Sequence, residues 1–128
     1  MQIYSADKAF EKIALNKELL SQADLEDLKE QLDKRREDGT WLAIEELAME
    51  TGTLDAKDIK RILKSRARYG RHCLDCREIT YLLPKQRSSK VRCEYCEGQL
   101  ESGRIDGTRS HGFRAERRTR ALEALGLL

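Results

Sequence analysis

Four cysteines are the residues of this chain whose types and spacing point most directly to chemistry. Cys73 and Cys76 form one C-x-x-C pair, Cys93 and Cys96 form a second, sixteen residues separate the pairs, and the chain has no other cysteine. Two tight turns that face each other can hold four thiolates at about 2.3 Å from one ion in a tetrahedral site. Because four thiolates leave no coordination position open, the spacing predicts one structural metal ion, which we expect to be Zn2+.

Two alternatives to this arrangement concern the metal and its ligands. A rubredoxin-like iron site, which would make the protein a redox carrier, has similar spacing but usually lies in an aromatic-rich domain, and aromatic residues are 5% here. His72 could replace one thiolate, but with four thiolates available we expect it to be a solvent-facing neighbour. The sequence contains no Ser/His/Asp set, no glycine-rich phosphate loop and no HExxH motif, so we do not expect an enzyme.

The residues around the cysteines predict short strands joined by a turn. Residues 78–83 are β-branched and aromatic, residues 84–89 have the composition of a turn, and residues 90–92 lead straight into the second pair. Residues 98–100 are expected to form a short return strand. This order of elements predicts a zinc ribbon over residues 71–102. Neither cysteine pair is followed directly by a glycine, since Arg77 and Glu97 stand at those positions.

The first 70 residues predict helices that end at Gly39, Gly52 and Gly70. Ser21 and Asp55 are the expected N-cap residues of two helices, each with an apolar face. The two blocks align at an offset of 34 residues, which matches Ile13 with Leu47, Ala14 with Ala48, Leu20 with Leu54, Ser21 with Asp55, Leu25 with Ile59 and Leu28 with Ile62. We interpret this as a duplicated helical hairpin forming a four-helix cluster, to which Phe10, Trp41 and Ile44 add core side chains. Chance similarity of two amphipathic helix pairs is the alternative.

The second unit carries a resemblance to a known family. Residues 44–55 read I-E-E-L-A-M-E-T-G-T-L-D and are followed by Ile59, Ile62 and Leu63. Together with the repeat, this stretch makes residues 6–68 similar to the N-terminal domain of type II secretion and type IV pilus assembly ATPases. The resemblance implies a duplicated helical hairpin that serves as a docking fold. Some members of that family bind cyclic di-GMP through an R-L-G motif in each unit, but residues 9–11 and 43–45 read A-F-E and A-I-E here, so we do not expect nucleotide binding to carry over.

Residues 46–52 carry a second resemblance. They read E-L-A-M-E-T-G, similar to the E-L-A-x-x-x-G opening of DNA-binding helix–turn–helix units. This implies that residues 56–68 form a recognition helix whose cations face phosphates, although a plain helical hairpin has the same pattern. The cations on and after this helix are Lys57, Lys60, Arg61, Lys64, Arg66, Arg68 and Arg71.

Charge is divided between the two halves of the chain. Residues 1–59 hold 8 Lys/Arg and 15 Asp/Glu, a net of −7, whereas residues 60–128 hold 17 Lys/Arg and 8 Asp/Glu, a net of +9, and together they give the overall +2. We expect the acidic side chains on solvated helix faces and the basic half against nucleic acid or an acidic protein surface, although a basic surface without a partner is possible. The candidate contacts are Lys60, Arg61, Lys64, Arg87, Lys90, Arg92, Arg114, Arg117 and Arg118.

Targeting signals are absent from the sequence as it stands. Residues 1–10 show no basic segment followed by an apolar one, and no apolar run approaches the roughly 18 residues that span a bilayer. We therefore expect a soluble cytoplasmic protein without membrane contact, in a compartment where thiols stay reduced and bind metal.

These patterns predict an α+β protein with three parts. Residues 1–70 are the four-helix domain of two hairpins, residues 71–102 are the zinc ribbon, and residues 103–128 are a linker followed by a basic C-terminal helix. We predict a regulatory protein that binds nucleic acid through its basic half. The alternative is a protein–protein adaptor whose acidic helical domain docks one partner protein and whose ribbon docks another.

Overall fold

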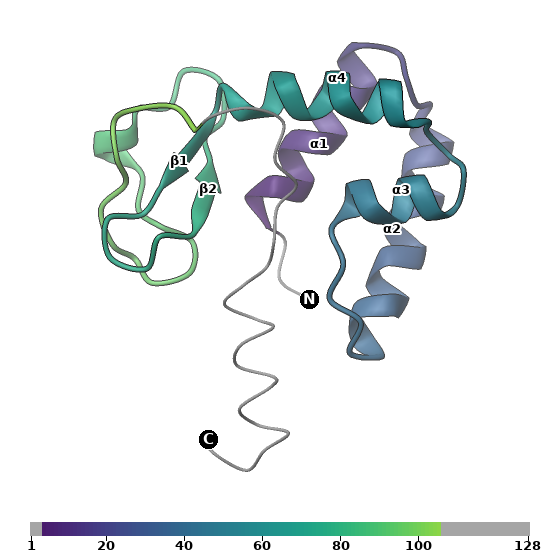
Figure 1. Cartoon of the computed structure of the whole chain (residues 1–128), viewed down its shortest axis with the longest axis horizontal. Coiled ribbons are helices and arrows are strands. Elements are labelled where there is room, and N and C mark those ends of the chain that lie inside the picture. Colours follow the sequence, from purple (N-terminus) through teal and green to yellow (C-terminus); the bar gives the residue numbers. More distant parts are fainter. Residues whose placement is uncertain (1–3, 106–128) are drawn as a thin grey trace.

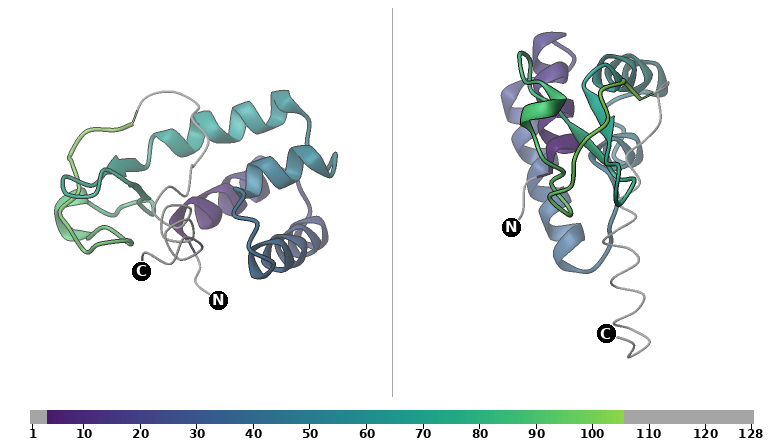
Figure 2. Two further views of the ribbon diagram at one scale, coloured as in Figure 1. Left: turned by 60° about the horizontal axis from the view of Figure 1, so that its bottom comes forward. Right: turned by 90° about the vertical axis from the view of Figure 1, so that its left-hand side faces the viewer.

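The structure is a computed structural model, and it describes residues 4–105. Four helices gather at one end, and a small two-stranded sheet with the cysteine-bearing loops lies at the other (Figure 1 and Figure 2). The predicted α+β class is confirmed. The elements are α1 (Ser5–Asn16), α2 (Gln22–Glu37), α3 (Ile44–Glu50), α4 (Ala56–Ala67), β1 (Gly70–His72), β2 (Ile79–Tyr81) and the short 3-10 helix η1 (Ser88–Lys90). The predicted basic C-terminal helix lies outside the described residues.

The helix boundaries follow the predicted capping residues at most positions. The Ser21 hydroxyl accepts a hydrogen bond from the Asp24 N–H at 3.1 Å, and the Asp55 carboxylate accepts one from the Asp58 N–H at 2.8 Å. Both bonds satisfy an N–H that a helix start would otherwise leave without a partner. Gly39 follows α2 with a φ of 91° and so takes the left-handed conformation that glycine adopts without a steric penalty.

Gly70 has a different role from the predicted one. It does not end a helix, because α4 stops at Ala67 and Gly70 opens β1. A Cβ at this position would lie 2.7 Å from Ile105 Cδ1 and 3.0 Å from Tyr81 Cε1. The missing side chain therefore allows Ile105 to close over the sheet.

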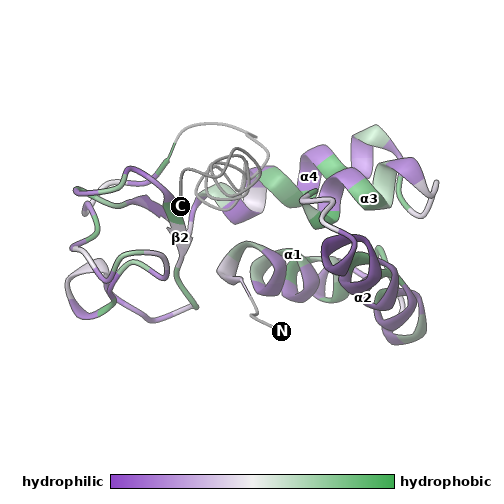
Figure 3. Cartoon of the chain, turned by 90° about the horizontal axis from the view of Figure 1, so that it is seen from below, coloured by the Kyte–Doolittle hydropathy of each residue, from purple (hydrophilic) through white to green (hydrophobic). Residues whose placement is uncertain are grey.

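The helical core is built from the predicted apolar positions of both hairpins. Phe10 and Ile44 are fully buried in it, whereas Trp41 is half-buried in a smaller cluster with Tyr4. The most extensive contacts pair α1 with α4 and α2 with α3, so helices of one hairpin pack on helices of the other. Most residues of α2 are hydrophilic (Figure 3). In four of the pairs aligned at an offset of 34 residues, both members are buried: Ala14 with Ala48, Leu20 with Leu54, Leu25 with Ile59 and Leu28 with Ile62.

Two arginine–carboxylate pairs are buried beside this core, so the expectation of solvated acidic side chains is wrong for Glu45 and Asp7. Arg66 Nη2 donates to Glu45 Oε1 at 2.8 Å and Arg66 Nη1 donates to Glu45 Oε2 at 3.2 Å, with side chains 1% and 3% exposed. Arg66 Nη1 also donates to the Ala6 carbonyl, and its guanidinium carbon lies 4.8 Å from the Tyr81 ring centroid. The helix–turn–helix resemblance implied that Arg66 faces a phosphate. Because Arg66 is buried and paired, it is not available for that contact.

The second pair joins α2 to α1. Arg36 Nη1 donates to Asp7 Oδ2 at 2.7 Å, and Arg36 Nη2 reaches the Leu42 carbonyl at 3.1 Å. Burial raises the pKa of Asp7, because the loss of solvation outweighs the attraction of Arg36. In each pair, the buried arginine makes two hydrogen bonds to the carboxylate and a further one to a backbone carbonyl, which offsets the cost of removing both charges from water.

The cysteine-bearing part contains less strand than the sequence predicts. β1 and β2 pair antiparallel, with Arg71 opposite Thr80. The predicted strand over 78–83 is confirmed only at Ile79–Tyr81. The end of the predicted turn over 84–89 belongs to η1, and the second strand expected over 90–92 does not form, because Lys90 is still part of η1. The return segment is borne out by two isolated bridges, Cys73 with Leu100 and Arg92 with Gln99. β1 itself carries no β-branched residue and was not predicted.

The helices and the sheet share buried side chains. Ala6 and Ala67 of the helices pack with Ile79, Tyr81 and Ile105 in one cluster. Ile105 falls in the segment predicted as a linker, yet it is 8% exposed. The parts predicted over residues 1–70 and 71–102 are therefore in direct contact. No helix within residues 4–105 has the length and apolar character needed to cross a membrane.

Candidate metal centre and basic surface

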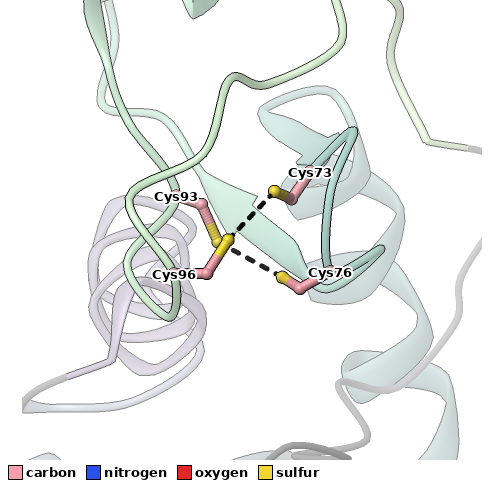
Figure 4. Close-up of side chains that lie close together, drawn as sticks. All are labelled: Cys73, Cys76, Cys93 and Cys96. Atoms are coloured by element: carbon pink, nitrogen blue, oxygen red, sulfur yellow. Dashed lines mark hydrogen bonds between the residues drawn. The ribbon is translucent and has the colours of Figure 1, made fainter.

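The four cysteine sulfurs converge at one point between two facing loops (Figure 4). All four Sγ atoms lie within 4.8 Å of one another, with Cys73 and Cys96 3.4 Å apart and Cys76 and Cys93 3.6 Å apart. Sulfurs at about 2.3 Å from a tetrahedral ion are about 3.8 Å from each other, whereas a disulfide requires about 2 Å. The predicted gathering is confirmed, and the donor set fits one metal ion.

The two cysteine loops have the same backbone structure. In the first, the Arg77 N–H donates to the Cys73 carbonyl at 3.1 Å, and in the second the Glu97 N–H donates to the Cys93 carbonyl at 3.0 Å. The first sulfur of each loop accepts a backbone N–H two residues later at 3.4 Å. Donors aimed at sulfur stabilise a thiolate, so both loops prepare their leading cysteine for metal binding.

The position after each second cysteine takes the left-handed conformation. Arg77 has a φ of 67° and Glu97 a φ of 64°, where glycine would be free of strain. The tight turn therefore imposes this geometry whether or not glycine is present. Gly98 serves another purpose, because a Cβ there would lie 2.9 Å from Cys73 Sγ and would also meet the Asp75 carboxylate. Gly98 stands one residue later than a glycine directly after the second cysteine pair would, and its packing against the Cys73 sulfur explains this position.

The thiols differ in acidity because their surroundings differ. Burial raises the pKa of Cys73, but the backbone N–H groups of Cys76 and Asp75 and the neighbouring thiols outweigh it and bring the value to about 7. Burial raises the pKa of Cys76 to about 12, with further increases from the adjacent sulfurs. Negative charges on four neighbouring sulfurs repel one another, so few of the four thiols are ionised in the absence of a metal. A divalent cation offsets this repulsion.

His72 lies beside the site without joining it. Its Nδ1 is 3.2 Å from the Arg77 carbonyl oxygen, and the metal-binding group within residues 4–105 consists of the four cysteines. Behind the sulfurs, Leu82 and Leu100 are buried with Cys73 and Cys93. The ion would therefore connect the two loops over this small apolar cluster. A core of this size usually needs a metal ion or disulfides to be stable.

The second cysteine loop also contacts the start of α1, which sequence reasoning missed. The Glu94 carboxylate accepts hydrogen bonds from the Ser5 hydroxyl and from the Ser5 N–H, the latter at 2.9 Å. Tyr95 stacks on Tyr4, with ring centroids 6.0 Å apart. The N-cap of α1 has no side-chain bond of its own, so Glu94 supplies the acceptor from a distant part of the chain. No local pattern marks such a long-range cap.

The predicted cations lie in two separate groups. Lys60, Arg61 and Lys64 are exposed on α4, where Arg61 Nη1 lies 3.9 Å from Asp58 Oδ1. A second exposed group surrounds η1, at the end of the molecule away from the middle of α4 (Figure 1 and Figure 2), and consists of Arg87, Lys90 and Arg92. The remaining candidates lie outside the described residues and are Arg114, Arg117 and Arg118.

Comparison with known proteins adds no relative. No family model, no curated protein and no solved structure matches this chain. The resemblance to the N-terminal domain of secretion ATPases stays a prediction, and the function has to be argued from the residues themselves.

Proposed function

We propose that this chain is a non-catalytic protein that binds nucleic acid through a basic surface stabilised by one structural Zn2+ ion in a zinc ribbon. Four sulfur donors in a tetrahedral arrangement suit zinc or iron, and zinc is the usual ion of closed structural sites. With all four positions filled by protein, the ion has no place for a substrate or an activated water. Its role is to hold the surrounding loops.

The observation that carries the proposal is the loop between the two cysteine pairs. Within residues 85–92, here called the basic loop, four exposed cations occur with no acidic residue: Lys85, Arg87, Lys90 and Arg92. None of them forms an ion pair with any residue in the range 4–105. Cations without carboxylate partners, held by an ordered loop, are suited to a phosphate backbone.

The metal is tested first. Purified protein should contain one zinc ion per chain and be colourless, whereas a red iron-containing protein would overturn the choice of zinc. Cys93→Ser should lose the ion and unfold residues 71–101, because binding free energy of a structural site is also folding free energy. Retention of the ion and of the fold in this variant would contradict a structural role.

Nucleic-acid binding is tested on the zinc-loaded protein with short single-stranded DNA, single-stranded RNA and duplex DNA. Affinity should fall steeply between about 50 and about 300 mM salt, with a logarithmic slope of about −3 on single strands if four cations contact phosphates. Arg87→Gln/Lys90→Gln should reduce that slope by about 1.4. Binding that does not depend on salt, or no binding to any of the three probes, would refute the proposal.

A second candidate, a docking surface for a partner protein, is supported by one feature of the helical part. A shallow hollow of about 300 Å3 lies between α3 and α4, lined chiefly by Met49, Ala56, Ile59 and Leu63. Met49 is 49% exposed there. A protein recovered with the chain after nuclease treatment should be lost with Met49→Glu and kept with Leu74→Glu, a control that is 50% exposed outside the hollow. Equal loss with both variants would argue against this surface.

A further inference from the structure

A cavity of about 400 Å3 lies where α4 leads into β1, and it is lined by four cations. Arg68 follows the end of α4, Arg71 lies on β1, Lys85 belongs to the turn after β2, and Arg104 comes from the final described segment. The junction of α4 and β1 can be followed in Figure 1. No Asp or Glu lines the cavity, and within residues 4–105 none of the four cations forms an ion pair.

Arg71 is held in place by the backbone around it. Its Nη1 donates to the Gly70 carbonyl at 2.8 Å and to the Arg68 carbonyl at 3.0 Å. Its Nε is buried and has no hydrogen-bond partner in the part of the chain that the structure describes. Burial lowers the pKa of Arg71, and the positive charge of Arg104 lowers it further. A fixed guanidinium close to like charges is preorganised for an anion.

Lys85 reaches the cavity from a strained backbone position. The Gln86 N–H donates to the Leu83 carbonyl at 3.0 Å, and Lys85 has a φ of 76°, so residues 83–86 form a turn with proline second and lysine third. A turn of this type favours glycine at the third position. A lysine here brings a cation to the cavity at a conformational cost.

Apart from Gln86, the rest of the wall is apolar and aromatic. Leu82 and Leu83 line the cavity together with Tyr69. Proteins that bind single strands combine cations for the backbone with aromatic rings for the bases. The combination fits a phosphate with part of a nucleotide attached better than it fits a bare carboxylate.

We propose that this cavity is a phosphate-binding site in which Arg68, Arg71, Lys85 and Arg104 hold a backbone phosphate of a single-stranded nucleic acid. The assignment rests on the proposed function and adds a specific place for one phosphate. Arg68 and Arg71 belong to the cations noted around α4 in the sequence, Lys85 is shared with the basic loop, and Arg104 is new. Tyr69 lies where a neighbouring base could stack.

The decisive variants are a matched pair of glycine substitutions. Lys85→Gly and Arg77→Gly each remove one exposed cation from a left-handed position, where glycine is free of strain, so both should fold. Arg77→Gly also removes an exposed ion pair with Glu101, which contributes little to stability. Lys85→Gly should weaken single-strand binding about fivefold, while Arg77→Gly, outside the cavity, should change affinity less than about twofold. Arg104→Gln should weaken binding about tenfold.

A second measurement separates this inference from the proposed function. Pyrophosphate is titrated into isotope-labelled, zinc-loaded full chain, and amide shifts are expected at residues 68–71 and 85–86. Shifts there without binding of any oligonucleotide would keep the cavity as a site for free phosphate compounds and refute the proposed function. Oligonucleotide binding that Lys85→Gly and Arg77→Gly weaken equally, with no pyrophosphate shifts, would refute the cavity and leave the proposed function standing.

Discussion

Replacing Arg66 by methionine tests whether the buried ion pair holds the helices and the sheet together. Arg66 and Glu45 are 1% and 3% exposed and share bonds of 2.8 and 3.2 Å, and Arg66 also bonds the Ala6 carbonyl. Arg66→Met leaves the Glu45 carboxylate buried without its guanidinium partner. Breaking a buried pair from one side costs about 3–5 kcal/mol, a large share of the about 5–15 kcal/mol that stabilises a typical domain. At about 4 °C per kcal/mol, Tm should fall by about 12–20 °C.

The assay is thermal unfolding of the zinc-loaded protein, with Arg35→Met as the matched control. Arg35 also pairs with a glutamate, Glu50, at 3.1 Å, but the two side chains are 39% and 54% exposed. An exposed pair contributes about 0–1 kcal/mol, so the control should lower Tm by less than about 4 °C. The double variant Arg66→Met/Glu45→Leu should recover most of the loss, because apolar side chains can replace a buried pair. Equal effects of Arg66→Met and Arg35→Met would refute the reasoning.

Three further predictions concern the metal site and its contact with the helices. Gly98→Ala should weaken zinc binding at least about tenfold in a chelator competition, because its Cβ would lie 2.9 Å from Cys73 Sγ, and unchanged affinity would contradict that packing. Glu94→Ala should lower the free energy of unfolding of the zinc-loaded protein by about 1 kcal/mol, because α1 loses its cap. An equal drop in the metal-free protein would show that this cap does not depend on the metal in the second cysteine loop. Zinc binding should release about one proton fewer at pH 8 than at pH 6, measured with an indicator dye, because the Cys73 thiol has a pKa of about 7 and loses its proton across this range. A constant proton count would contradict that acidity.

The contact between Glu94 and Ser5 links the cysteine-bearing part of the molecule to the helices. Glu94 belongs to the second cysteine loop, and it accepts the Ser5 N–H at the helix start. The Tyr81 N–H donates to the Ser5 hydroxyl at 2.8 Å, which extends the same network to β2. A metal ion that orders the loops therefore also orders the first turn of a helix whose other face is in the core.

Local sequence patterns were sufficient to predict the cluster of four cysteines, the helix caps and most of the helical core. Each C-x-x-C pair closes a turn of a few residues, and the caps at Ser21 and Asp55 involve residues three positions apart. The apolar faces repeat with the period of the helix. The residues that form each turn, each cap and each apolar face lie close together in the chain, so the sequence shows these patterns, although the two cysteine pairs and the helix faces then meet across longer separations.

Packing between distant segments sets which charges are buried and which face solvent. Arg66 looks like the other cations of α4, and only packing against Glu45 and Tyr81 removes it from the surface. The cavity likewise combines Arg68, Arg71, Lys85 and Arg104 from separate segments. Burial of a charge depends on what distant chain segments place around it, because desolvation must be offset by partners that a local pattern does not contain. The cysteine spacing and the helix pattern can thus be recognised in the sequence, whereas the charged surface depends on packing between distant segments.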